Sequence, residues 1–253
     1  MLKENMHIHS KYSWDCVKYG KMEIAEIAKI LYENGIRYGA ITDHVEFDRE
    51  PLPYVLTSLK VRNLEIDRVN EIYDGKVTLL KAVEISSPHL YIDKVKALEE
   101  LDLDFLMGSI HKMIRNAKTP TDKIHASYLY YSELLKMIES QTVDVIGHID
   151  YINRYYDKDY SFAYQISDIM KAISENHQIM EINTSAARRI DKDTFPSLEK
   201  ICTYKLSGNN EVTIGTDAHQ YSELTDNLDN IDKIINTLDL KPVIYQKRKR
   251  III

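Results

Sequence analysis

Histidine and carboxylate side chains recur along this chain at spacings that suit a metal site. His7 and His9 flank a single isoleucine in the stretch MHIHSKYSWD, and Asp15 follows shortly after. Near the other end of the sequence, Asp217 and His219 repeat the i, i+2 spacing. Residues i and i+2 of a strand face the same side, so each pair would point its polar groups one way. Imidazole nitrogens and carboxylate oxygens are ligands of divalent transition metals, so metal binding is the chemistry that these residues could perform.

Short apolar runs alternating with amphipathic stretches would have to position these side chains. The runs that have the length and residue types of buried strands span residues 6–9, 38–44, 77–85, 105–111, 143–150, 179–185 and 212–219. The stretches with helical periodicity span residues 21–35, 91–101, 128–141, 162–177 and 227–240. Strands alternating with helices predict an α/β protein with a parallel sheet.

The spacing of the seven predicted strands suits a closed β/α barrel, with an open doubly wound sheet as the alternative. No glycine-rich phosphate-binding loop follows any of the predicted strands, which favours the barrel over a nucleotide-binding open sheet. The length of 253 residues and the even composition predict a single domain over residues 1–253.

The predicted strands carry polar residues at or near their carboxyl ends. Five of them end in a histidine, and the third carries an acidic residue: His9, His44, Glu84, His111, His148 and His219. The carboxyl ends of parallel barrel strands meet on one face, which would gather these side chains with His7, Asp15 and Asp217. A single strand-end histidine is usually structural. So many imidazoles and carboxylates at one buried place would be costly to desolvate unless cations bind them. We therefore expect two or three divalent transition-metal ions (Zn, Mn, Fe or Co).

Composition excludes several other classes of protein. The formal net charge of −6 disfavours nucleic acid and anionic membranes as partners. No apolar run is long enough to span a membrane, and the first residues lack an apolar signal core. Two distant cysteines, Cys16 and Cys202, make neither a disulfide framework nor a thiolate cluster, so we expect a cytoplasmic protein. The basic run QKRKRIII is expected to be a solvated tail or the end of a last helix, and it is assigned no function.

Six separated motifs resemble those of the PHP (polymerase and histidinol phosphatase) family of metal-dependent phosphoesterases. They are HIHS (7–10), ITDH (41–44), VEI (83–85), GSIH (108–111), GHID (147–150) and GTDAH (215–219), in the family's order. The stretches HIDYINRYY and EINTSAARR are most similar to the monofunctional histidinol-phosphate phosphatases. The resemblance implies a distorted (β/α)7 TIM-like barrel that carries a trinuclear metal site.

The resemblance also implies how the ligands divide among three metals. The first metal would take His7, His9, Glu84 and Asp217. The second would share Glu84 and take His111 and His148, and the third would take Asp15, His44 and His219. Asp43 is interpreted as a partner that orients a ligand histidine, with a simple turn or cap residue as the alternative.

The function that this resemblance favours is hydrolysis of histidinol phosphate to histidinol and phosphate, by attack of a metal-bridging hydroxide held by Glu84 and its partners. Phosphate groups are commonly bound by guanidinium groups. Arg188 is the first candidate for phosphate binding and Arg154 the second. Arg189 is interpreted as a solvated neighbour. Asn183 and Ser185 could donate to the substrate or only cap a turn. The candidate proton donors are His89 and a water on Asp15.

Other functions stay open at this point. The nearest alternative is a PHP phosphoesterase for another small phosphate ester, a nucleotide or an oligonucleotide. A metallohydrolase of the amidohydrolase type would need a bridging lysine, but Glu84 holds that place and Lys112 merely follows His111. A non-catalytic relative would be expected to have lost ligands. The sequence sets no oligomeric state, and segment 45–76 could form a lid.

Overall fold

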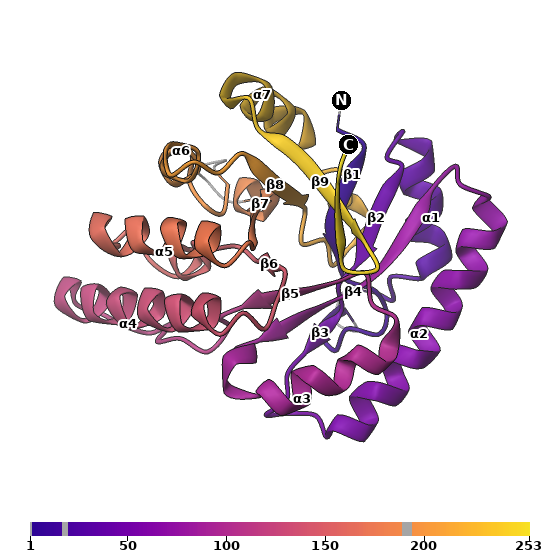
Figure 1. The fold of residues 1–253 in the computed structure, drawn as a ribbon, viewed down its shortest axis with the longest axis horizontal. Helices are drawn as coiled ribbons and strands as arrows, with labels where there is room; N and C mark the ends of the chain where they lie inside the picture. Colours follow the sequence, from indigo (N-terminus) through magenta and orange to yellow (C-terminus); the bar gives the residue numbers. More distant parts are fainter. Residues whose placement is uncertain (1, 17–19, 189–193) are drawn as a thin grey trace.

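The computed structural model describes residues 2–16, 20–188 and 194–253 of the chain. Within these residues the protein has an α/β fold in which strands fill the centre and helices lie around the outside (Figure 1). The sheet is parallel except for its last pair of strands, which is antiparallel. No helix in the described ranges is long and apolar enough to cross a membrane.

The strands of the described chain form one sheet in the order β1-β2-β4-β5-β6-β7-β8-β9-β10, with β3 paired to β4. Their bounds are β1 (Glu4–Ile8), β2 (Tyr38–Ile41), β3 (His44–Val45), β4 (Thr78–Ser86), β5 (Phe105–Ser109), β6 (Val145–Ile146), β7 (Ile179–Asn183), β8 (Glu211–Gly215), β9 (Lys241–Gln246) and β10 (Lys249–Ile252). The first and eighth strands also approach each other, since the His9 amide donates to the carbonyl oxygen of Ala218 at 3.0 Å and Ile8 forms a parallel bridge with Ala218.

Amphipathic helices connect most of the parallel strands. Their bounds are α1 (Ile24–Glu33), α2 (Leu52–Tyr73), α3 (Ile92–Lys96), α4 (Pro120–Glu139), α5 (Ala163–Glu175), α6 (Leu198–Leu206) and α7 (Leu228–Leu238). Helix α4 begins at a capping box, in which the Thr119 side chain accepts from the Asp122 amide and the Asp122 carboxylate accepts from the Thr119 amide. Helix α1 ends just before Gly35, whose φ of +72° suits glycine.

Apolar side chains fill both faces of the parallel strands. One large buried cluster lies between the strands and the helices and includes Ile27 of α1 and Leu134 of α4. A second, separate cluster collects residues from the other face of the strands: Met6, Ala40, Leu80, Ala82, Phe105, Met107, Val145, Ile179, Val243, Ile244 and Tyr245. Burial on both faces explains why the strands read as continuous apolar runs in the sequence.

The structure confirms the predicted alternation of strands and helices and corrects several details. The predicted strand 38–44 is divided into β2 and β3, and helices α2 and α6 were missed. The prediction for the run QKRKRIII was wrong, because residues 249–252 form β10 in a hairpin with β9. The segment 45–76 is mainly α2, which packs against α1 and β4. Only its first residues, including Glu46 and Arg49, reach the cavity described below.

Glu4 supplies a pH-dependent prediction. Its side chain is buried at the start of β1, where Oε2 accepts from the Lys3 amide at 2.9 Å and Oε1 has no hydrogen-bond partner among the described residues. Burial raises the pKa of Glu4 to about 7. The folded state therefore binds the Glu4 proton more tightly than the unfolded state does. The resulting contribution to the free energy of unfolding is present in full below pH 4.5 and is lost as the pH rises through 7.

We expect Glu4→Gln to remove this pH dependence. Relative to the wild type, the variant should gain unfolding free energy between pH 4.5 and pH 8, by up to about 3 kcal/mol. Urea unfolding across that range measures the difference, and the half-buried Glu26 of α1, whose side chain is 43% exposed, is the control when changed to Gln. A constant difference at all pH values would contradict the prediction.

Candidate metal centre

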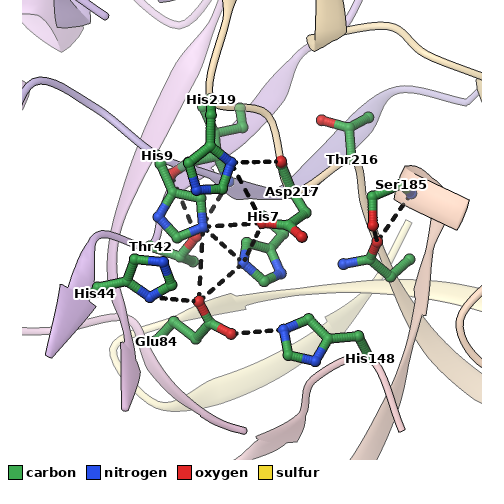
Figure 2. A network of polar contacts seen from close by, with 12 residues as sticks. His7, His9, Thr42, His44, Glu84, His148, Ser185, Thr216, Asp217 and His219 are labelled. Carbon is green, nitrogen blue, oxygen red and sulfur yellow. Dashed lines mark hydrogen bonds and ion pairs between the residues drawn. The ribbon is translucent and has the colours of Figure 1, made fainter. Parts of the chain in front are cut away.

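The side chains of all nine predicted metal ligands converge at the carboxyl ends of the parallel strands. Figure 2 shows His7, His9, His44, Glu84, His148, Asp217 and His219 among them. Their nitrogen and oxygen atoms form four overlapping groups in which all ligand atoms lie within 4.8 Å of one another. These groups are His9, Asp15, His44 and His219; His7, His9 and Asp217; His7, Glu84 and His148; and His44, Glu84 and His111. The shared members make the four groups one continuous cluster.

Glu84 lies at the centre of this cluster and is fully buried. Its Oε1 lies 2.8 Å from His148 Nε2 and 3.1 Å from His111 Nε2. Its Oε2 lies 2.9 Å from His44 Nδ1 and 3.4 Å from His7 Nε2. Strand pairing sets part of this arrangement, because His44 of β3 lies directly opposite Glu84 of β4. The two oxygens face different sets of histidines, as the oxygens of a bridging carboxylate would.

His7, His9 and Asp217 form one side of the cluster. The Nε2 atoms of His7 and His9 are 3.0 Å apart, and Asp217 Oδ1 is 3.2 Å from His9 Nε2. Asp217 follows β8 with a φ of 52°, and its amide donates to the carbonyl oxygen of His7 at 2.9 Å. This contact between the ends of β1 and β8 brings together the two i, i+2 pairs noted in the sequence.

Asp15 forms the opposite side of the cluster. Its Oδ2 lies 3.1 Å from His44 Nε2 and 2.9 Å from His219 Nε2. The His219 ring is fixed from behind, where its Nδ1 lies 2.9 Å from the carbonyl oxygen of Asp217. The loop after β1 therefore carries Asp15 to the pair of histidines with which it was grouped in the sequence.

The cluster fits a set of bound cations. His7 and His9 turn imidazole nitrogens toward each other, and Glu84 Oε2 and His44 Nδ1 are close without the geometry of a hydrogen bond in the described chain. Lone pairs that face one another in a buried place are costly unless a cation accepts them. All donors are nitrogen or carboxylate oxygen, which suits zinc, manganese or iron.

The electrostatics of the cluster ionise its carboxylates and keep His9 neutral, while the same carboxylates, against the effect of burial, raise the pKa values of four other histidines: His7, His44, His111 and His219. Burial would raise the pKa values of Glu84 and Asp217, but the neighbouring imidazoles hold both well below the usual range. Burial, together with the nearby His219 and His44, lowers the pKa of His9 to about 3. A neutral imidazole and an ionised carboxylate are the forms that act as ligands.

Asp43 has a different role from the one that the sequence suggested. Its Oδ1 accepts from the Ser10 amide at 2.6 Å, and its Oδ2 accepts from the Ser10 hydroxyl at 2.8 Å and lies 3.4 Å from a guanidinium nitrogen of Arg62. Among the hydrogen bonds of the described residues, none joins Asp43 to a ligand histidine. Asp43 thus fixes the backbone directly after His9 and does not orient an imidazole.

Glu181 was missed by sequence reasoning and does contact a predicted ligand. This fully buried residue of β7 lies 2.7 Å from His7 Nδ1. The signal available in the sequence was an acidic residue in the middle of the apolar run IMEIN.

A cavity of about 170 Å³ opens onto the cluster. Besides the predicted ligands on its wall, its lining includes an aromatic and cationic group of residues that sequence reasoning largely missed: Trp14, Arg49, Lys112, Arg115, Tyr151 and Arg154. Arg154 packs its guanidinium over the Tyr151 ring at 4.5 Å and lies 3.4 Å from Asp217 Oδ2. Of the two predicted phosphate-binding arginines, Arg154 is therefore the one at the cavity wall.

Arg188, the first candidate from the sequence, is engaged elsewhere. Its guanidinium donates to the carbonyl oxygens of Thr216 and Asp217 and pairs with Asp226 at 2.8 Å. It holds the loop after β8 from outside and does not belong to the cavity lining in the described chain. Phosphate binding by Arg188 stays a prediction, and in this structure its guanidinium is engaged by backbone carbonyls and carboxylates. Arg189 lies outside the described residues.

Asn183 and Ser185 support the cavity wall without lining it. The Ser185 amide and hydroxyl donate to Asn183 Oδ1 at 2.9 and 2.6 Å, and Arg154 donates to the Ser185 hydroxyl at 3.1 Å. Both residues are buried, so they orient Arg154 and do not present donors to the cavity. The remaining histidines lie apart from the cavity: His89 is 3.1 Å from Glu133, and His125 and His177 are exposed.

Comparison with known proteins identifies the family. The model of the PHP domain matches residues 5–185. The chain belongs to the PHP family. A protein of Thermotoga maritima named a probable histidinol-phosphatase is 29% identical to this PHP chain over 220 residues, covering 85% of the chain and 84% of the relative. A Clostridium acetobutylicum protein of the same name is 27% identical over 262 residues, covering 96% of each.

A solved structure has the same fold as this PHP chain. The histidinol phosphate phosphatase from Lactococcus lactis subsp. lactis, crystallised with zinc, L-histidinol and phosphate, superimposes with a TM-score of 0.79. The match covers 99% of this chain and 100% of the other at 18% sequence identity.

Proposed function

We propose that this PHP chain is a metal-dependent hydrolase of phosphate monoesters and that its substrate is histidinol phosphate. The observation that carries the proposal is the continuous cluster of six histidines and three carboxylates beneath a cavity whose wall includes Arg154. The names of its relatives support the substrate. The Lactococcus lactis enzyme of the same fold, solved with L-histidinol and phosphate, supports it as well.

We propose that the cluster holds two or three divalent ions, with the ligands divided as the family resemblance implies. Glu84 would then be shared by two ions, and the Asp15, His44 and His219 side would hold a third. Such cations would supply an activated water near neutral pH and positive charge for the phosphate oxygens. Sharing of Glu84 by the first two ions is supported by Oε2, which lies 3.4 Å from His7 Nε2, and by Oε1, which lies close to His111 and His148. Oε2 also lies 2.9 Å from Nδ1 of His44, which this division gives to the third ion.

The same proposal includes a distorted (β/α)7 barrel and a single domain over residues 1–253. Hydrogen bonds between the ends of β1 and β8 support closure of the barrel. The second core cluster supports it too, because its side chains come from seven different strands and pack together.

Arg154 should bind the phosphate group. We expect Arg154→Ala to lower kcat/KM by roughly 10- to 100-fold, because a hydrogen bond to a charged group contributes about 1.5–3 kcal/mol. Arg154→Lys should recover part of the loss, since an ammonium keeps the charge and loses the planar fork. Steady-state kinetics measure the effect, and the control is the same change at an exposed arginine, Arg37→Ala. Wild-type kinetics for Arg154→Ala would remove this residue from the phosphate site.

The reaction itself is tested by a phosphatase screen of the full chain supplemented in turn with zinc, manganese and iron(II). The substrates are histidinol phosphate, sugar phosphates, nucleoside monophosphates and a dinucleotide. We expect histidinol phosphate to have the highest kcat/KM. Efficient turnover of another ester without turnover of histidinol phosphate would refute the substrate and keep the reaction class.

A nucleotide or another ester with a second anionic group is the alternative substrate. The observation that favours it is the number of cations on the cavity wall, where Arg49, Lys112 and Arg115 accompany Arg154. Two of them are neutralised in part, since Arg49 pairs with Glu46 and Lys112 with Asp48, each at 2.6 Å. The nucleoside monophosphates and the dinucleotide in the screen decide between the two substrates.

A further inference from the structure

Glu181 is a buried carboxylate that belongs to none of the candidate ligand groups. It lies on β7, and its side chain reaches between the ends of three other strands. Its Oε1 lies 2.7 Å from Nδ1 of His7, which is on β1. Its Oε2 accepts from the amide of His148 at 2.8 Å and from Asn183 Nδ2 at 3.2 Å. Both oxygens are therefore in use away from the centre of the cluster.

A carboxylate can only accept hydrogen bonds, which determines the tautomer of His7. The short contact requires that Nδ1 carry the proton. In the neutral ring, the other nitrogen, Nε2, then has a free lone pair. This Nε2 faces the cluster, 3.0 Å from His9 Nε2 and 3.4 Å from Glu84 Oε2 (Figure 2). The contact with Glu181 thus selects, for the neutral ring of His7, the tautomer that can act as a ligand.

Gly215 of β8 leaves the space that this contact needs. A Cβ atom at Gly215 would lie 2.2 Å from Glu181 Oε1 and 2.4 Å from His7 Cβ. The second distance involves an atom next to the His7 backbone, which cannot turn away as the end of a flexible side chain can. Any side chain at position 215 would therefore clash with both Glu181 and His7, so glycine at this position permits their contact.

We propose that Glu181 is a positioning residue for the metal centre. It fixes the tautomer and ring orientation of His7. It also accepts from the amide of His148 and so fixes the backbone at this second predicted ligand. This inference rests on the proposed metal centre and assigns a role to a residue outside it. A partner that accepts from the outer nitrogen of a ligand histidine usually changes metal affinity by 10- to 100-fold when it is lost.

Glutamine at position 181 separates this role from a structural one. Glu181 Oε2 receives two donors, the His148 amide and Asn183 Nδ2. The single oxygen of a glutamine amide would take that place, and its NH2 group would face His7 Nδ1. Nδ1 would then have to accept, which moves the proton to Nε2 and removes the lone pair needed for a metal. Alanine removes the contact but imposes no tautomer.

The test measures zinc affinity of the full chain by competition with a chelator, and thermal unfolding of the metal-free protein, for Glu181→Gln and Glu181→Ala. We expect Glu181→Gln to weaken zinc binding 10- to 100-fold, more than Glu181→Ala does, while its metal-free Tm stays nearer that of the wild type. A merely structural role gives the opposite order, with the isosteric Gln variant close to wild type in affinity. That order would overturn the proposal.

Two controls separate this inference from the proposed metal centre. Glu4→Gln makes the same change in a buried glutamate at the far end of β1 and should keep wild-type zinc affinity. Glu84→Gln removes a direct ligand and should lose affinity. If the wild type binds zinc no better than Glu84→Gln, the metal centre itself is refuted. If the wild type and Glu181→Gln bind zinc with the same affinity while Glu84→Gln binds it more weakly, only the proposed role of Glu181 is refuted.

Discussion

Replacing Glu84 by glutamine should lower phosphatase activity by about a thousandfold or more and reduce the number of metal ions held per chain. Glu84 is fully buried, and its two oxygens lie within 3.4 Å of nitrogens from four histidines. Glutamine keeps the shape but removes the charge and one of the two oxygens that could coordinate a metal. Bound cations contribute several kcal/mol to the stabilisation of a phosphoryl transition state, and each 1.4 kcal/mol or so corresponds to a factor of ten in rate.

The measurements for Glu84→Gln are elemental analysis and kcat under saturating metal. Wild-type protein should hold more than one equivalent of metal per chain, and the variant should hold fewer. His125→Ala is a suitable control, because His125 is exposed on α4 away from the cluster. A variant with unchanged metal content and unchanged kcat would show that Glu84 bridges nothing.

Replacing Arg62 by methionine should destabilise the protein by about 3–5 kcal/mol, because it leaves a buried carboxylate without its counter-charge. Arg62 of α2 and Asp43 are both almost completely buried, and their charged groups are 3.4 Å apart. Arg62 also donates to the Asn63 side chain at 2.9 Å. Methionine can fill much of the volume but cannot pair with Asp43.

The double variant Arg62→Met with Asp43→Asn tests the cause of this loss. Asparagine can still accept from Ser10 and carries no charge, so the double variant should recover part of the stability that Arg62→Met loses. Urea unfolding of the wild type, both single variants and the double variant gives the coupling energy. Additive losses would mean that the ion pair contributes nothing and that packing of the Arg62 stem explains the effect.

The sequence by itself determined the alternation of strands and helices and the residues of the cluster. Parallel strands that are buried on both faces must be apolar, so a polar residue at the end of such a run stands out. The carboxyl ends of parallel strands lie at the same edge of the sheet. Residues as distant in sequence as His9 and His219 could therefore be expected to meet there without any knowledge of loop conformation. The structure places both beside Asp15.

Tertiary structure alone decided what the neighbouring charged residues do. Arg154 and Arg188 both follow strand ends, yet one lines the cavity and the other holds the carbonyl oxygens of residues 216 and 217. The direction of a long side chain after a strand depends on partners from distant segments, such as Ser185 for Arg154 and Asp226 for Arg188. Local periodicity contains no information about such partners.

The same reason explains Asp43 and Glu181. Both are acidic residues in or next to apolar strands, and nothing in their local sequence distinguishes a partner of arginine from a partner of histidine. Asp43 meets Arg62 because α2 packs over that part of the sheet, and Glu181 meets His7 because Gly215 leaves room between them. The sequence determined which groups lie at the strand ends, since strand burial depends on a local pattern. Which group touches which was decided by packing between segments far apart in the chain.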